Sequence, residues 1–243
     1  FYIYPILKYV AAVIIIGLLG LNLYKMVQPA TVGENTVEVP KGQRASLMLS
    51  DGTKIWLNSQ SKLIYPTQFS DKERNVRLEG EAFFDVAHKE HLPFVVHSPL
   101  LAIKVLGTKF NVSSYPEDIS AKTTLLEGSI DILYKGRHIP VAPGELLSLD
   151  KQNGSFSRQK VQASQYKSWT EGRVEYDKIT LNELAVRLSR KYDVQIHLGD
   201  DLEKDIAFRV SLRNEETVGD VFHALSEIIP IRYERRELSL IHI

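Results

Sequence analysis

Short runs of alternating apolar and polar residues fill the chain from Val37 to about Ser157. The clearest, VEVPKGQRASLMLSDGTKIWLN at residues 37–58, places such runs on both sides of Asp51-Gly52, a dipeptide typical of hairpin turns. Similar runs, separated by glycine or proline, continue to GELLSLD at residues 144–150 without sustained helical periodicity. Many short strands joined by tight turns predict a sandwich or a rolled, solenoid-like antiparallel sheet.

Helical periodicity begins only nearer the C-terminus. LNELAVRLSRKY at residues 181–192 puts its apolar residues on one stripe, with Thr180 as N-cap and Glu183 at the capping-box position. VGDVFHALSEII at residues 218–229 follows Thr217 in the same way. VQIHL, IAFRVSL and the terminal IRYERRELSLIHI have strand character, the last as a hairpin. This order predicts a small α+β domain of βαββαββ type.

The N-terminal stretch YVAAVIIIGLLGL, residues 9–21, is uninterrupted apolar sequence. With its flanks it approaches the roughly 20 residues of a membrane-spanning helix. Lysines and tyrosines placed as at the two interfaces of a bilayer flank it: Lys8, Lys25, Tyr2, Tyr4, Tyr9 and Tyr24. A signal peptide and a buried core helix are the alternatives. We expect a transmembrane anchor, whose orientation the lysines do not fix, and a natural protein that begins before Phe1.

These patterns divide the 243 residues into five segments. We predict an anchor at 1–27, a polar linker at 28–36 and a β domain at 37–160. A connector at 161–172, with Trp169 as its packing residue, leads to the α+β domain at 173–243. The expected fold class is therefore mainly β, with an N-terminal transmembrane helix and a C-terminal α+β domain.

Composition narrows the possible functions. Thirty basic residues balance thirty acidic ones, so net charge favours neither a nucleic-acid nor an acidic-lipid partner. The absence of cysteine excludes disulfides, thiolate zinc sites and a cysteine nucleophile. The sequence also has no serine elbow and no phosphate-binding glycine loop. We interpret the basic residues of RLSRKY at 187–192 and YERRE at 233–237 as parts of solvated faces.

Carboxylates cluster in LEGEAFFDV, residues 78–86, where Glu79, Glu81 and Asp85 fall on one face of the predicted strand. Glutamates two apart on a strand are separated by about 7 Å, which suits an inverting glycosidase. That chemistry also needs the two groups to face each other across a cleft, and neighbours on one strand seldom do so. We interpret these carboxylates as the solvent-exposed face of a half-exposed strand and predict no catalytic residue.

His88 and His91, close to Asp85 and Glu90, are the best candidates for a metal site. Pro93 and the surrounding strand patterns place both histidines in a loop, so we interpret them as solvated surface. We predict neither a metal nor another cofactor.

Several longer motifs occur in a fixed order. They are VPKGQRASLMLSDGTKIWLNSQSKLIYP at 39–66, VRLEGEAFFDVAHKEHLPFVV at 76–96, IKVLGTKFNV at 103–112, LLEGSIDI at 125–132 and APGE at 142–145. Together they resemble the FecR family of transmembrane anti-sigma factors. The C-terminal unit is similar to the small domain, related to the N-terminal domains of secretins and transporters, that ends many members. The positions that carry the resemblance are Gly42, Asp51, Gly52, Trp56, Leu57, Asn58, Tyr65, Pro66, Gly80, Glu81, Phe84, Val86, Pro93, Phe94, Leu106, Gly107, Thr108, Phe110, Gly128, Pro143, Gly144, Trp169 and Gly172.

The resemblance implies a single-pass inner-membrane protein of a Gram-negative cell, with most of the chain in the periplasm. It implies two protein partners, the N-terminal signalling domain of a TonB-dependent outer-membrane transporter and an extracytoplasmic-function (ECF) sigma factor. Periplasmic and intramembrane proteases would release the cytoplasmic segment that binds the sigma factor, and that segment is absent from this chain. An iron chelate and a glycan both remain candidates for the imported ligand.

We expect the transporter's signalling domain to dock on an edge strand of the C-terminal domain. The candidate docking residues are Phe208, Val210, Leu212, Leu238, Leu240 and His242. A membrane-tethered periplasmic scaffold and a glycan-active enzyme are the alternative functions.

Overall fold

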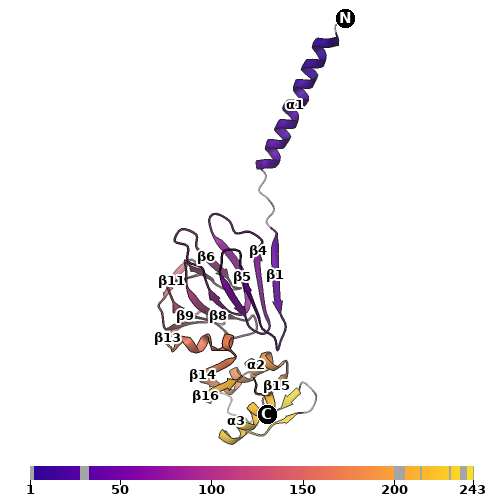
Figure 1. Cartoon of the computed structure of the whole chain (residues 1–243). Coiled ribbons are helices and arrows are strands. Elements are labelled where there is room, and N and C mark those ends of the chain that lie inside the picture. The colour runs from indigo at the N-terminus through magenta and orange to yellow at the C-terminus, as the bar shows by residue number, and fades with distance from the viewer. Residues whose placement is uncertain are drawn as a thin grey trace. The chain divides into compact units, whose positions relative to one another are not determined.

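The computed structural model describes residues 3–27, 33–199, 206–213, 215–229, 231–235 and 240–242 (Figure 1). The contacts within the chain divide it into two compact units, Phe1–Gly33 and Glu34–Ile243.

The first unit contains helix α1 (Ile3–Val27), which forms where the apolar stretch lies. Its described side chains between Tyr9 and Tyr24 include many exposed valines, isoleucines and leucines. In the part of the chain that the structure describes, no helix is both long and apolar enough to cross a membrane. The transmembrane assignment of this segment stays a prediction.

The second unit begins with a curled sheet of thirteen strands, counted over the described residues. The strands are β1 (Glu34–Val39), β2 (Ala45–Met48), β3 (Lys54–Leu57), β4 (Ser61–Pro66), β5 (Arg74–Asp85), β6 (Phe94–His97), β7 (Ala102–Val105), β8 (Lys109–Ser114), β9 (Ser120–Glu127), β10 (Ile130–Tyr134), β11 (Arg137–Val141), β12 (Glu145–Asp150) and β13 (Phe156–Lys160). The predicted rolled, mainly β fold is confirmed.

Strand β5 belongs to both layers of the roll. Its first half pairs with β4 and β6, and its second half pairs with β3 and β8. One layer therefore has the order β1-β4-β5-β6-β7-β10-β11, and the other has the order β2-β3-β5-β8-β9-β12-β13. The prediction of a purely antiparallel sheet is wrong at one place, because β5 and β6 run parallel. The second half of β5 carries the chain into the other layer, so the chain must cross back before β6 begins.

The bend in β5 lies at Gly80, whose φ of +106° disfavours residues that carry a Cβ atom. The hydroxyl of Ser61 accepts a hydrogen bond from the Glu81 N–H at 2.9 Å and donates to the Glu81 carbonyl at 3.1 Å. A Cβ atom on Gly80 would lie 2.7 Å from the Cα of Ser61. Glycine is therefore needed here both for the backbone angle and for the close approach of β4.

The space between the two layers is filled by aliphatic and aromatic side chains, with Phe84 stacked on Phe110 at 5.0 Å. Arg74, at the start of β5, is a charged residue whose side chain is nevertheless fully buried. Its guanidinium pairs with Asp51 at 2.6 Å and donates to the carbonyls of Ala87, Leu92 and Leu106. One side chain thus fixes the β2–β3 turn and the two loops on either side of β6 and β7.

The C-terminal domain follows two short 3-10 helices, η1 (Ala163–Tyr166) and η2 (Ser168–Glu171). Its elements are β14 (Arg173–Thr180), α2 (Leu181–Tyr192), β15 (Gln195–His197), β16 (Ala207–Arg213), α3 (Val218–Ile228), β17 (Glu234–Arg235) and β18 (Leu240–His242). This is the predicted βαββαββ order. The strands form two small sheets, β14-β16 and β15-β18-β17.

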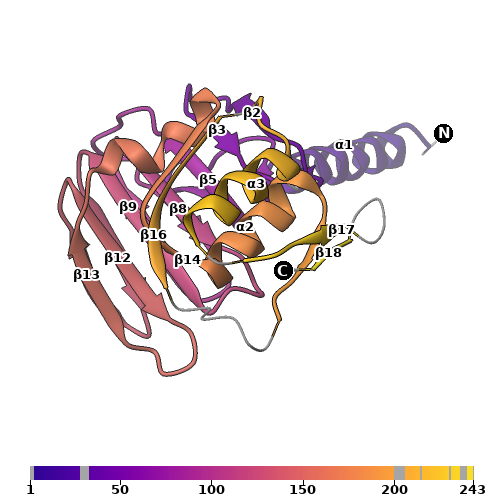
Figure 2. The same cartoon turned by 90° about the horizontal axis from the view of Figure 1, so that it is seen from below.

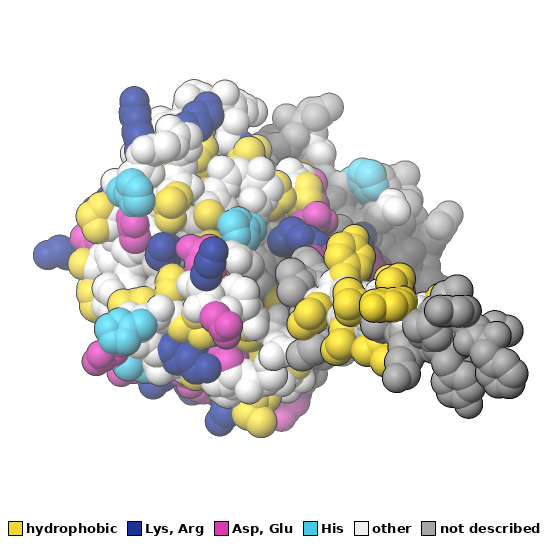
Figure 3. Space-filling view, turned by 90° about the horizontal axis from the view of Figure 1, so that it is seen from above, with side chains coloured by type: hydrophobic (Ala, Val, Ile, Leu, Met, Phe, Trp, Pro, Cys, Tyr) yellow, Lys and Arg dark blue, Asp and Glu magenta, His cyan; other side chains and the backbone are white. Residues whose placement is uncertain are grey.

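Both helices of this domain begin at the predicted N-caps. The Thr180 hydroxyl accepts from the Glu183 N–H, and Thr217 forms a complete capping box with Asp220. Figure 2 shows both helices in front of the strands of the β domain. Lysine and arginine side chains are interspersed with acidic ones on the face displayed in Figure 3, as expected for a chain with no net charge.

Candidate functional site

An extended arrangement of polar side chains lies where α2 and η2 meet the face of β5 and β8. We call this surface the interdomain interface. Its apolar part is Phe83 of β5, which is only 1% exposed and belongs to the core of the C-terminal domain. Trp56 and Leu126 of the β domain pack against the same core. The outward face of β5 around Phe83 is thus covered by the second domain.

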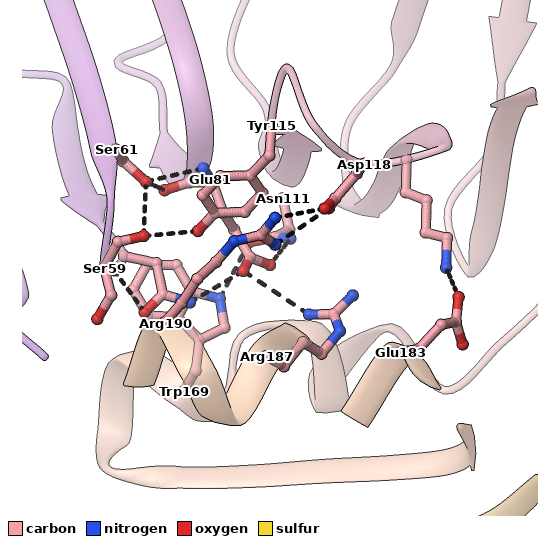
Figure 4. A network of polar contacts seen from close by, with 12 residues as sticks. Ser59, Ser61, Glu81, Asn111, Tyr115, Asp118, Trp169, Glu183, Arg187 and Arg190 are labelled. Carbon is pink, nitrogen blue, oxygen red and sulfur yellow. Dashed lines mark hydrogen bonds and ion pairs between the residues drawn. The ribbon is translucent and has the colours of Figure 1, made fainter. Parts of the chain in front are cut away.

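Glu81 lies at the centre of this interface with 5% of its surface exposed (Figure 4). Its two carboxylate oxygens accept hydrogen bonds from the side-chain amides of Asn58 and Asn111, each at 2.9 Å. The guanidinium of Arg187 on α2 lies 3.9 Å away. The interpretation of Glu81 as a wet surface residue is therefore wrong. The alternation of apolar and polar residues along β5 correctly indicated that the strand has two different faces. The outer face at Glu81 and Phe83 is covered by the C-terminal domain and not by water.

Glu79, two residues earlier on β5, is exposed. The two glutamates do not share a cleft, since one faces solvent and the other is enclosed beneath α2. Glu81 is held by two amides and faces a guanidinium, so its contacts join the β domain to α2.

The connector between the domains is fixed by the same network. The indole N–H of Trp169 donates to the Asn111 side-chain oxygen at 3.1 Å. Arg44 donates to the Trp169 carbonyl at 2.8 Å and to the Asn58 side-chain oxygen at 3.2 Å. Trp169 is buried, as expected for the packing residue of this segment.

Helix α2 presents a charged stripe, Glu183, Arg187 and Arg190, to the β domain. Glu183 pairs with Lys122 of β9 at 2.9 Å. Arg190, with 8% of its side chain exposed, pairs with Glu117 at 3.0 Å and with Asp118. Its guanidinium also lies 3.8 Å from the centre of the Tyr115 ring. The prediction that these arginines form a solvated face is wrong, because α2 is covered on two sides.

Burial changes the acid–base properties of the interface. It raises the pKa of Tyr115, and the nearby Glu81 carboxylate adds to this rise. Burial also raises the pKa of Tyr176, and it raises the pKa of Tyr192 to about 12. Burial alone would lower the pKa of Arg187, but attraction to Tyr176 and Glu81 outweighs it, so the pKa of Arg187 is raised. The arginine of the stripe therefore stays charged although it is covered.

A cavity of about 680 Å³ lies between the two domains, lined by polar and charged side chains that include Glu81, Lys122, Tyr166, Tyr176 and Arg187. Three of the carboxylates at its wall are paired with cations. These pairs are Glu81 with Arg187, Glu183 with Lys122, and Asp177 with Arg209. The first two pairs join α2 to the β domain and can hold the two domains in a defined position, whereas Asp177 and Arg209 lie on the neighbouring strands β14 and β16.

The sequence-predicted signature residues lie mainly in the framework of the β domain. The structure brings four of them together at the interdomain interface, Trp56, Asn58, Glu81 and Trp169. The buried aliphatic and aromatic ones lie in the core of the roll: Leu57, Phe84, Val86, Phe94 and Phe110. The glycines Gly42, Gly52, Gly80, Gly128, Gly144 and Gly172 have positive φ angles. Asp51 is both a turn residue and the ion-pair partner of Arg74.

The remaining signature positions do not converge on the interface. Tyr65 and Pro66 end β4, Leu106, Gly107 and Thr108 form the β7–β8 turn, and Pro93 and Pro143 precede β6 and β12.

Of the two strands predicted to offer a free edge for docking, only β16 has one in the structure. Among the described strands β16 pairs only with β14, so one of its edges is open, whereas β18 lies between β15 and β17. The prediction of an edge at Leu240 and His242 is therefore wrong, because the parallel partner β15 comes from a distant part of the sequence. Val210 and Leu212 point into the core of the C-terminal domain, and Leu238 lies outside the described residues.

The histidines do not form a cluster. His91 has 97% of its side chain exposed and lies 4.0 Å from Glu90. Over the described residues, no group of three or more His, Cys, Asp or Glu side chains is placed to hold a metal ion.

Sequence reasoning missed Arg74, Asn111, Tyr115, Arg187 and Arg190. A signal for two of them was present, because Glu183, Arg187 and Arg190 follow a spacing of four and three residues. This charged stripe lies beside the apolar stripe of the same helix. It therefore indicates a second face of α2 that contacts protein. No comparable local pattern marks Arg74.

Two family models match the chain, one described as "FecR protein" over residues 35–131 and one described as "FecR, C-terminal" over residues 173–241. Two crystal structures, at 1.65 and 2.50 Å resolution, of a protein from Parabacteroides distasonis that is assigned by inference as an anti-sigma factor have similar folds. Both are 28% identical to this chain, cover 86% of it and 97% and 98% of their own chains, and give TM-scores of 0.81 and 0.80. No curated protein sequence matches the chain.

Proposed function

The chain belongs to the FecR family of anti-sigma factors, and we propose that it receives and transmits the signal in a membrane-tethered member of that family. The family has a signalling role, and the fold points to a regulatory protein. In this proposal the C-terminal domain binds the N-terminal signalling domain of a TonB-dependent outer-membrane transporter. The bound state then controls an ECF sigma factor.

The observation that carries the proposal is the interdomain interface. The C-terminal domain is docked on the β domain by Phe83 and by the hydrogen bonds around Glu81, within one compact unit. A partner that binds the C-terminal domain can therefore change the β domain through direct contacts. Coupling of about 1 to 3 kcal/mol is enough for a 5- to 150-fold response.

We further propose that α1 anchors the protein in the inner membrane, with Glu34–Ile243 in the periplasm. The exposed apolar side chains of α1 support this, because such a surface is stabilised by lipid and not by water. The sigma-binding segment would then lie across the membrane. Proteases that cut near residues 28–36 and within the membrane would release it.

The open edge of β16 is the proposed docking surface. A partner strand can add its backbone hydrogen bonds there, and exposed side chains such as Arg209 lie on the same strand. Arg209 is paired with Asp177 at 2.6 Å but keeps most of its side chain exposed, so it can also contact an acidic group of the partner.

The test is calorimetric titration of residues 34–243 with the N-terminal signalling domain of the cognate TonB-dependent transporter. We expect saturable one-to-one binding that weakens by about tenfold in Arg209→Ala. Arg77→Ala is the matched control, because Arg77 is also exposed and ion-paired but lies on the β domain. Absence of binding to the wild-type chain, with both ligand-loaded and ligand-free transporter, would end this proposal.

A further inference from the structure

Helix α2 lies between the core of its own domain and the polar face of the β domain. We propose that its contacts with the β domain form a latch that must open during signalling. The contacts that make up the latch are those of Glu183, Arg187 and Arg190 with Lys122, Glu81, Glu117, Asp118 and Tyr115. This inference rests on the proposed function and specifies the step that the partner regulates.

The latch is specific because each of its charges has a defined partner. Arg190 forms two parallel contacts with the Asp118 carboxylate, in addition to its contact with Glu117 and its position over the Tyr115 ring. Tyr115 in turn donates its hydroxyl to the Ser59 carbonyl at 2.8 Å. Removing one partner would leave the other charge partly enclosed without compensation.

The latch is also separable, because the two domains keep separate apolar cores. Phe83 is the one fully buried side chain of the β domain in the C-terminal core, within the described residues. Trp56 and Leu126 add partly buried apolar contacts, and the remaining contacts between the domains are hydrogen bonds and ion pairs. Covered ion pairs contribute little net stability because desolvation offsets their attraction. Relative motion is the usual behaviour of two domains of one chain whose contact is not a large hydrophobic one.

Opening of the latch would remove contacts that hold β1, the first strand of the β domain. The turn between β1 and β2 contains Gly42, whose N–H donates to the Arg190 carbonyl at 2.8 Å. The same turn leads to Arg44, which holds the Trp169 carbonyl. Strand β1 pairs only with β4 among the described strands, so it is an edge strand that the turn helps to fix. Release of α2 would therefore loosen β1, which begins directly after the first unit of the chain.

The experiment measures the distance between the domains. The chain has no cysteine, so His91→Cys on the β domain and Ile228→Cys on α3 give two unique sites for spin labels. Wild-type residues 34–243 should give one narrow distance distribution by double electron–electron resonance. Arg190→Ala should raise the open population by at least about tenfold and speed amide exchange in β1.

Two further variants separate the latch from general damage. Arg158→Ala removes an exposed ion pair with Glu145 inside the β domain and should leave the distribution unchanged. Arg190→Lys keeps a positive charge beside Glu117 and Asp118 and should keep most of the closed population. An Arg190→Ala chain with wild-type distance and wild-type exchange in β1 would overturn the latch, as would an Arg190→Lys chain that is as open as Arg190→Ala.

Adding the transporter's signalling domain separates the latch from the proposed function. Binding that shifts the wild-type chain towards the open distance supports both. Binding without any change in distance would overturn the latch and leave the proposed function standing. No binding would overturn the proposed function.

Discussion

Gly80 and Glu81 are neighbours on β5, and the fold requires different side chains at the two positions. Gly80 must lack a side chain so that β4 can approach, whereas Glu81 must keep a charged one beneath α2. Both residues stand in the stretch that first suggested a catalytic carboxylate cluster. For Glu81 the structure replaces the predicted solvent-exposed position with a buried one in contact with α2.

Gly80→Ala should destabilise the protein by about 3 kcal/mol, from the positive φ angle and from the contact with Ser61. Gly136→Ala separates the two causes, because Gly136 also has a positive φ but nothing lies within 4 Å of the added Cβ. It should lose only about 1 kcal/mol. Urea unfolding of residues 34–243 measures both. Equal losses in the two variants would show that the contact with Ser61 carries no cost.

Glu81→Gln should destabilise the chain by about 2 kcal/mol. A glutamine has one acceptor oxygen, but both Asn58 and Asn111 donate amide hydrogens to this side chain. Asn111 cannot turn its amide round without losing the hydrogen bond from Trp169.

Glu79→Gln is the matched control for Glu81, because Glu79 lies two residues away on the same strand and is exposed. We expect its unfolding free energy to change by less than about 0.5 kcal/mol. Loss of a glycan-cleaving activity in the Glu81 variant would instead revive the enzymatic interpretation.

Helix α2 and strand β5 show which features of the secondary-structure elements could be predicted from the sequence. The bounds of α2 were predicted at residues 181–192 because its cap and its apolar stripe are local features. The alternation of β5 was also predicted, but its partner on the outer face begins almost a hundred residues later in the chain. The position of β18 inside a sheet was missed for the same reason, since its partner β15 is distant in sequence.

The tyrosines around α2 give the interface a characteristic response to alkaline pH. Tyrosines exposed by unfolding ionise near pH 10, whereas burial raises the pKa of Tyr115, Tyr176 and Tyr192 in the folded chain. Above about pH 10 the unfolded chain therefore binds fewer protons than the folded one, so stability must fall as pH rises.

Urea midpoints measured between about pH 8 and pH 11 should show this fall. Tyr115→Phe should make the fall less steep, because one group that titrates differently in the two states is removed. Its stability at neutral pH should also drop by about 1 kcal/mol, because the hydrogen bond to the Ser59 carbonyl is lost. A midpoint that stays constant up to pH 11 in the wild-type chain would contradict burial of these rings.

At the scale of the whole molecule, two apolar cores meet at the interdomain interface. The β domain is a curled roll, and the C-terminal domain has, among its described strands, an open edge at β16. The contacts of α2 lie between them and reach β1 through the turn at Gly42. A binding event at β16 therefore has a continuous route of packed and hydrogen-bonded residues to the strand that follows the first unit.

Hydrogen–deuterium exchange of residues 34–243, with and without the transporter's signalling domain, tests this route most directly. We predict slower exchange at β16, where the partner adds its strand, and faster exchange in α2 and β1, where contacts are released. Slower exchange at β16 with no change in α2 or β1 would contradict the account, because the two domains would then not relay the binding event.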